Sequence, residues 1–303
     1  MKRIPGLAAA LLAGVALLSQ AAPVAAQQDF RWSGRLARGE QISVRGIVGD
    51  IRAEPTSGAE VVVTAVRRGR GARDVRIETV RRSEGVVICA LWPRDDDDRG
   101  WRGRRDRDDD HHDREPNDAC NRSGGSTRDN DARVDFTVRV PAGVRVSLGT
   151  VSGDVYATGL HSPVRAASVS GDVRVSSDGP VQATSVSGDV DATLGRIAGQ
   201  SLHFTSVSGN VTLRVPASID ADFSARTLSG SIDSDFPLTI GSGRDRPRGR
   251  DRDRDDDDDD DDGYGPGRIH VRIGQNASGR LGRGGPDLTV NTVSGDIALV
   301  RAR

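Results

Sequence analysis

The hexapeptide Thr150-Val151-Ser152-Gly153-Asp154-Val155 indicates the fold, because the chain repeats it at short intervals. Aligned copies follow at 168–173, 185–190, 206–211, 227–232 and 292–297, and an outlying copy, Gly46-Ile47-Val48-Gly49-Asp50-Ile51, lies near the N-terminus. The first five aligned copies follow one another at short, nearly regular steps. The gap before the last copy is longer and has room for further rungs or for an insertion. Periods this short are typical of a solenoid in which each repeat forms one coil.

The parity of the apolar residues predicts the geometry of a repeat, because side chains alternate between two faces along a strand. We assign the aliphatic and glycine positions Val151, Gly153 and Val155 to the core and the intervening polar positions to the outer face. In the segment before each copy, such as 144–148, the apolar parity is opposite. A straight strand cannot exchange its buried face, so we expect a corner or bulge just before each motif. The sequence therefore predicts an all-β, single-stranded β-solenoid of short rungs, each made of two short strands.

The glycine and the residue after it form a predicted structural turn motif. Glycine permits a positive φ, or fits where the coil is too narrow for a side chain. The short polar residue after it can accept a hydrogen bond from nearby turn backbone. Its aspartates could alternatively form a cation site, but Asn210 and Ser231 fill the same position, so we favour the turn role and predict no metal site. The motif residues are Gly153, Asp154, Gly171, Asp172, Gly188, Asp189, Gly209, Asn210, Gly230, Ser231, Gly295 and Asp296.

Residues 138–146, Val138-Arg139-Val140-Pro141-Ala142-Gly143-Val144-Arg145-Val146, together with the motif that follows, resemble the bacterial putative-adhesin domain, a widespread uncharacterised domain of envelope proteins. The segments Asp235-Phe236-Pro237-Leu238 and Gly282-Arg283-Gly284-Gly285-Pro286 are similar to that family's later rungs and last coil. The resemblance covers roughly residues 133–300, with weaker similarity at 42–91. It implies a single-stranded β-solenoid, secreted or membrane-attached, with roles in adhesion or in sensing envelope stress. It implies no catalytic residues.

The N-terminus has the three parts of a secretory signal peptide. Met1-Lys2-Arg3 is basic, residues 7–18 are apolar, and Val24-Ala25-Ala26 offers small residues for cleavage. The apolar part is shorter than the roughly 20 residues of a membrane-spanning helix, so we favour a cleaved peptide at 1–26 over an uncleaved anchor. We expect a mature chain without an integral membrane segment, located in the periplasm, outside the cell or at its surface.

The two cysteines, Cys89 and Cys120, are expected to pair. An exported protein enters an oxidising compartment, where a disulfide is stable. A bridge would contribute about 3 to 4 kcal/mol in the chain-entropy model. Two free thiols are the alternative, and neither cysteine has an adjacent base that would make it a nucleophile.

Two highly charged segments interrupt the repeats. Residues 93–132 mix Arg and Asp runs with the pair His111-His112, and residues 244–267 alternate Arg and Asp before an acidic run at 255–262. With almost no aliphatic residues they cannot offset their ordering entropy, so we expect disordered, self-neutralising loops. Cation binding by the Asp runs, metal capture by the histidines and contact with a charged polymer are functional alternatives. Around these insertions we predict an N-terminal β region with a first rung at 27–92, further rungs at 133–243, and final rungs with a C-terminal cap at 268–303.

Composition and motifs favour binding over catalysis. Aromatic residues make up 3% of the chain and glycines number 37, which suits thin stacked rungs. The net charge of −1 gives no global basic surface, so we predict no nucleic-acid partner. Phosphate loops and nucleophile elbows are absent from the sequence. We predict a non-enzymatic exported envelope protein without cofactors, an adhesin or scaffold that binds a surface polymer or protein. A cation-dependent envelope-stress sensor is the alternative, and a carbohydrate-active β-helix enzyme is less favoured.

Overall fold

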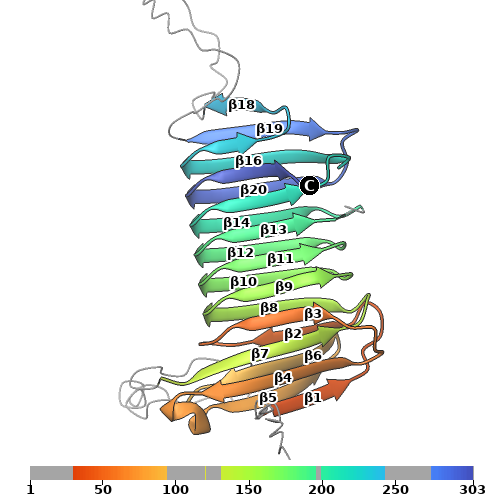
Figure 1. Cartoon of the computed structure of the whole chain (residues 1–303), viewed down its shortest axis with the longest axis vertical. Coiled ribbons are helices and arrows are strands. Elements are labelled where there is room, and N and C mark those ends of the chain that lie inside the picture. The colour runs from red at the N-terminus through yellow and green to blue at the C-terminus, as the bar shows by residue number, and fades with distance from the viewer. Residues whose placement is uncertain (1–29, 94–119, 121–130, 196–198, 243–273, 303) are drawn as a thin grey trace, which may run out of the picture.

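The computed structural model describes residues 30–93, 120, 131–195, 199–242 and 274–302, which form an elongated all-β body (Figure 1). Its strands form one sheet of ten strands and one of eleven. The expectation of a single-stranded solenoid is therefore wrong, because each rung contributes a strand to each of two sheets. The predicted signal peptide, the second charged insertion and most of the first, with His111 and His112, lie outside the described residues.

A regular rung consists of two strands separated by a short corner. In β8 (Arg145–Ser152) and β9 (Val155–Leu160), the corner is Gly153-Asp154. The first strand of each rung joins the eleven-stranded sheet and the second joins the ten-stranded sheet, and neighbouring rungs pair in parallel. The other rungs are β2 (Gln41–Arg45) with β3 (Ile51–Pro55), β10 (Val164–Ser170) with β11 (Val173–Ser177), β12 (Val181–Ser187) with β13 (Val190–Leu194), β14 (Leu202–Ser208) with β15 (Val211–Val215), β16 (Ala221–Ser229) with β17 (Ile232–Ser234), and β20 (Asp287–Ser294) with β21 (Ile297–Arg301).

The order of the rungs in space departs from their order in the sequence at both ends (Figure 1). The β20–β21 rung, last in the sequence, lies between β14–β15 and β16–β17. The β2–β3 rung, first in the sequence, lies between β8–β9 and the strands β6 (Gly85–Leu91) and β7 (Arg133–Val140). The motif copies at 227–232 and 292–297, which the long gap separates in the sequence, are therefore neighbours in the stack.

Antiparallel strands cover both ends of the stack. At one end, β1 (Phe30–Gly34) pairs with β4 (Val61–Arg68), β4 pairs with β7, and β5 (Arg76–Arg82) pairs with β6. The short 3-10 helix η1 (Arg70–Asp74) joins β4 to β5. At the other end, β19 (Gln275–Leu281) pairs with β16 and with β18 (Thr239–Ser242). No helix among the described residues is long and apolar enough to cross a membrane.

The core lies between the two sheets and corrects the predicted position of the corner. Strand β8 buries Val146, Leu148 and Thr150, and then leaves Val151 47% exposed. The buried face changes only at the Gly-Asp corner, after which Val155 is fully buried. The assignment of Val151 to the core is therefore wrong. The parity inversion is real, but the strand runs straight through the start of the motif and turns at its glycine.

Candidate functional site: the corner ladder and the outer valine row

The glycine of each motif lies against the backbone of the neighbouring rung. A Cβ atom at Gly188 would collide with the backbone carbonyl oxygen of Gly171 in the neighbouring rung. Gly188 also has a φ of 156°, and Gly153 has a φ of 146°, which side chains disfavour. The same collision with a neighbouring carbonyl oxygen would occur at Gly153, Gly171, Gly209, Gly230 and Gly295. The close backbone approach therefore requires glycine in all six copies.

The first motif residue is a hydroxyl residue that faces the core and donates a hydrogen bond to the motif glycine of the neighbouring rung. Ser185 is fully buried, and its Oγ donates to the carbonyl oxygen of Gly171 at 3.0 Å. Sequence reasoning missed this role, although a Ser or Thr occupies the position in all six copies. A bond to a carbonyl of the adjacent rung satisfies the buried hydroxyl, which explains why this position is polar. Equivalent bonds of 2.9 to 3.3 Å are donated by Thr150, Ser168, Ser206, Thr227 and Thr292.

The polar residue after the glycine links one rung to the next. Oδ1 of Asp172 accepts the backbone N–H of Asp189 at 3.0 Å, so the donor belongs to the corner of the next rung. The series forms what we call the corner ladder, in which bonds of 2.8 to 3.0 Å join Asp50, Asp154, Asp172, Asp189, Asn210, Asp296 and Ser231 in spatial order. Ser231 ends the series, and its Oγ also donates to Asp296 at 2.9 Å.

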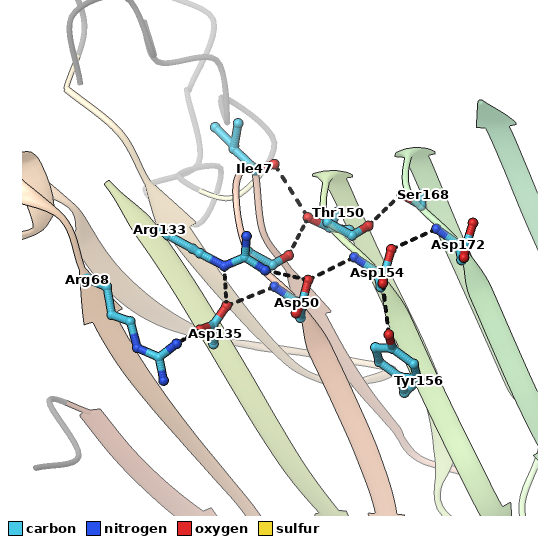
Figure 2. A network of polar contacts seen from close by, with 12 residues as sticks. Ile47, Asp50, Arg68, Arg133, Asp135, Thr150, Asp154, Tyr156, Ser168 and Asp172 are labelled. Atoms are coloured by element: carbon cyan, nitrogen blue, oxygen red, sulfur yellow. Dashed lines mark hydrogen bonds and ion pairs between the residues drawn. The ribbon is translucent and has the colours of Figure 1, made fainter. Parts of the chain in front are cut away.

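One end of the corner ladder carries a charge network that the motifs did not indicate (Figure 2). Asp135, from β7, accepts the backbone N–H of Asp50 at 3.1 Å. Arg133 contacts Asp50 at 2.7 Å and Asp135 at 2.9 Å, and Arg68 contacts Asp135 at 2.9 Å. Asp135 lies outside every motif copy, so only the pairing of β3 with β7 brings it into line. The two arginines neutralise the carboxylates where the ladder begins.

The carboxylates of the corner ladder are already engaged by protein donors. The Tyr156 hydroxyl donates to Oδ2 of Asp154 at 2.8 Å, and Arg174 contacts Oδ2 of Asp172 at 2.9 Å. Burial acts to raise the pKa of Asp154, but the bonds from the Asp172 N–H and the Tyr156 hydroxyl, with the Arg174 charge, outweigh it and lower the pKa. The bond to Asp154 in turn raises the pKa of Tyr156. This geometry gives the aspartates a structural task between rungs.

The second motif residue forms a continuous exposed line on the eleven-stranded sheet, which we call the outer valine row. Its members belong to the adjacent strands β8, β10, β12, β14, β20 and β16. A serine follows each member at the corner and is also exposed. No other large hydrophobic residue among those described is classed as exposed. In spatial order the row consists of Val151 (47% exposed), Val169 (43%), Val186 (40%), Val207 (40%), Val293 (44%) and Leu228 (63%).

The remaining predicted site residues lie away from this surface. Cys89, in β6, and Cys120 are both buried and form a disulfide at the end of the stack that β5 covers. Within the described ranges, no group of three or more His, Cys, Asp or Glu side chains is placed to hold a metal ion.

Comparison with known proteins gives one family match. The family model described as Toastrack DUF4097 matches residues 40–252. Among solved structures, a putative cell adhesion protein from Clostridium sporogenes is similar at 8% sequence identity, with 90% of this chain and 99% of that chain covered and a TM-score of 0.43. No curated protein matches the chain.

Proposed function

The chain belongs to the Toastrack DUF4097 family, and we propose that it is an exported, non-catalytic, adhesin-like scaffold of the cell envelope. The observation that carries the proposal is the outer valine row, which collects the exposed large hydrophobic residues of the described chain on one face. Soluble proteins rarely gather apolar residues on one exposed face unless that face binds something. We therefore assign the binding surface to the outer face of the eleven-stranded sheet.

The corner ladder supports a scaffold in preference to an enzyme. Catalysis by carboxylates needs groups that converge on a substrate and remain free to exchange protons. The motif aspartates instead accept backbone N–H groups of the next rung, and their second oxygens meet Tyr156 and Arg174 where these are in reach. These bonds stiffen the stack, and a stiff stack presents its outer residues at fixed intervals.

The partner that fits this face is extended. The outer valine row is one residue wide, and an exposed serine lies beside each member. A surface polymer, or a protein that presents its own regular row, can contact several rungs at once. Each contact is weak, and their number supplies the affinity.

The test is capture of the mature protein, residues 27–303, by cell-wall and outer-membrane fractions at 1 μM. The row variant V169T/V186T/V207T keeps the shape of each side chain but makes it polar. The matched control T193A/T212A alters exposed or half-exposed positions on the outer face of the ten-stranded sheet. We expect the wild type and the control to be retained and the row variant to be lost. Failure of every fraction to retain the wild type, or equal retention of the row variant, would contradict the proposal.

Export is tested separately, because the proposed signal peptide is independent of the binding face. We expect mass spectrometry of the protein from its native host to show an N-terminus near Gln27. An intact N-terminus in the cytoplasmic fraction would contradict export.

A further inference from the structure

The outer valine row has a regular spacing that restricts what can cover it. Its six members lie on adjacent parallel strands, so they repeat about every 4.8 Å and span about 24 Å along the stack. An extended strand laid along the row would offer one side chain about every 6.8 Å on the contacting face. A helix would offer one turn about every 5.4 Å. Both fall out of step with the row within a few rungs.

A second copy of this chain has the same spacing by construction. We propose that the outer valine row is a self-association surface, on which the row of a second copy packs face to face. This proposal rests on the proposed function, because it uses the same exposed face and names the protein partner. Two-fold symmetry is the usual arrangement for such a self-complementary patch.

The residues beside the row allow two sheets to approach. Two positions before each row member, the outward residues are Gly149, Ala167, Thr184, Thr205, Asn291 and Arg226. Four of these are small, and a Cβ placed on Gly149 would meet nothing within 4 Å. Interdigitated side chains can therefore bring the sheets to the spacing of about 10 Å that packed sheets adopt.

Arg226 selects the direction of the second copy. It is the one charged member of the flanking positions and lies at the end of the row beside Leu228. If both rows ran the same way, a two-fold axis would place the flanking positions of the two copies on opposite sides of the contact, and the large Arg226 would have no small flanking residue opposite it. If the rows run in opposite directions, Arg226 lies near the partner's Gly149, and Val186 lies opposite the partner's Val207. The antiparallel arrangement is therefore the one we assign.

The row is narrow, so the association is weak. A row one residue wide covers less than the roughly 800 Å² per partner of a standard interface. We expect a dimer with a dissociation constant on the order of 10 to 100 μM, formed where copies are concentrated on one surface.

Sedimentation velocity of the mature protein from about 1 to 500 μM tests the proposal. We expect the wild type to dimerise with concentration and V169T/V186T/V207T to dimerise at least tenfold more weakly, with melting curves that show both proteins folded. The variant T184V/T205V, which widens the row, should dimerise more strongly. A wild type that stays monomeric throughout, or a row variant that dimerises as well as the wild type, would overturn the proposal.

Cysteine cross-linking tests the direction. Mixed V186C and V207C proteins should cross-link to each other more than either does to itself, and self-cross-linking of V186C in excess would overturn the antiparallel arrangement. The envelope capture at 1 μM lies well below the expected dimer range. A protein that binds envelope fractions but stays monomeric overturns self-association alone, and one that dimerises but binds no fraction overturns the envelope partner alone.

Discussion

Two aliphatic rows run along the stack, four residues apart in every motif, and one row is exposed while the other is buried. The outer valine row is 40 to 63% exposed. The inner row, formed by the residues just after the corner, is at most 3% exposed and consists of Val155, Val173, Val190, Val211, Ile297 and Ile232. In a continuous strand, residues four apart would share one face. The comparison shows that the glycine corner, and not the hydrophobicity of the side chain, decides which valine is buried.

Damage to the glycine corner by Gly188→Val should have the largest effect on stability. The side chain would meet the carbonyl oxygen of Gly171, and φ at Gly188 is 156°. We expect a loss of about 3 kcal/mol or more in the free energy of unfolding, measured by urea denaturation. Gly149→Ala is the matched control, since its Cβ meets nothing within 4 Å, and it should be neutral or slightly stabilising. An unchanged unfolding midpoint in Gly188→Val would refute the role of the corner.

Truncation of one valine from each row of the same rung should have smaller and unequal effects on stability. Val190→Ala removes two methyl groups from a fully buried site between β11 and β15 and should cost about 2 kcal/mol. Val186→Ala removes the same atoms from a 40% exposed site and should cost less than about 0.5 kcal/mol. Thermal melts of the two variants below the dimer range measure the difference. Equal losses would mean that the outer row also belongs to the core.

The smallest expected effect on stability comes from Asp154→Asn, which removes a charge from the corner ladder and keeps its hydrogen bond. Asp154→Asn keeps an oxygen that can accept the Asp172 N–H, as Asn210 does naturally for Asp296. The folded-state pKa of Asp154 is lowered, so the unfolded state takes up its proton first as the pH falls. Its stabilising contribution is complete above the ordinary value of 3.8 and is lost as the pH falls through the lowered value.

Urea midpoints at pH 7, 5, 4 and 3 follow this contribution. The wild type should be more stable than Asp154→Asn at pH 7, and the difference should shrink below pH 4. A difference that stays constant across this range would show that the charge of Asp154 contributes nothing.

The sequence predicted the all-β class, the two-strand rung and the inversion of parity at each motif. It did not predict two sheets or the position of the corner, because parity alone cannot show whether Val151 or Thr150 faces inward. In the structure Thr150 faces inward and donates a hydrogen bond to the carbonyl oxygen of Gly49, which lies far from it in the sequence. The role of Asp135 was missed for the same reason, since it depends on the pairing of β3 with β7.

The order of the rungs could not be predicted from the repeats. Every copy carries a hydroxyl residue, a glycine and a short polar residue. The motifs alone therefore do not distinguish a stack in which β16 pairs with β14 from the observed stack, in which β20 lies between them. The repeated motif specifies the structure of one rung. The position of that rung in the stack depends on the connections between rungs. The long gap before the last motif copy was compatible with additional rungs. It contains instead the strands β18 and β19, which cover the end of the eleven-stranded sheet beyond β16.

The placement of β20–β21 has a consequence for biosynthesis. A ribosome makes residues 287–301 after every other described strand, yet these residues occupy an interior slot between β14–β15 and β16–β17. Rungs made earlier can assemble in order only as far as β15. A chain that stops before residue 287 would lack an internal layer and leave edges open in both sheets, where strands invite aggregation. The native order of the rungs can therefore form only after residues 287–301 have been made.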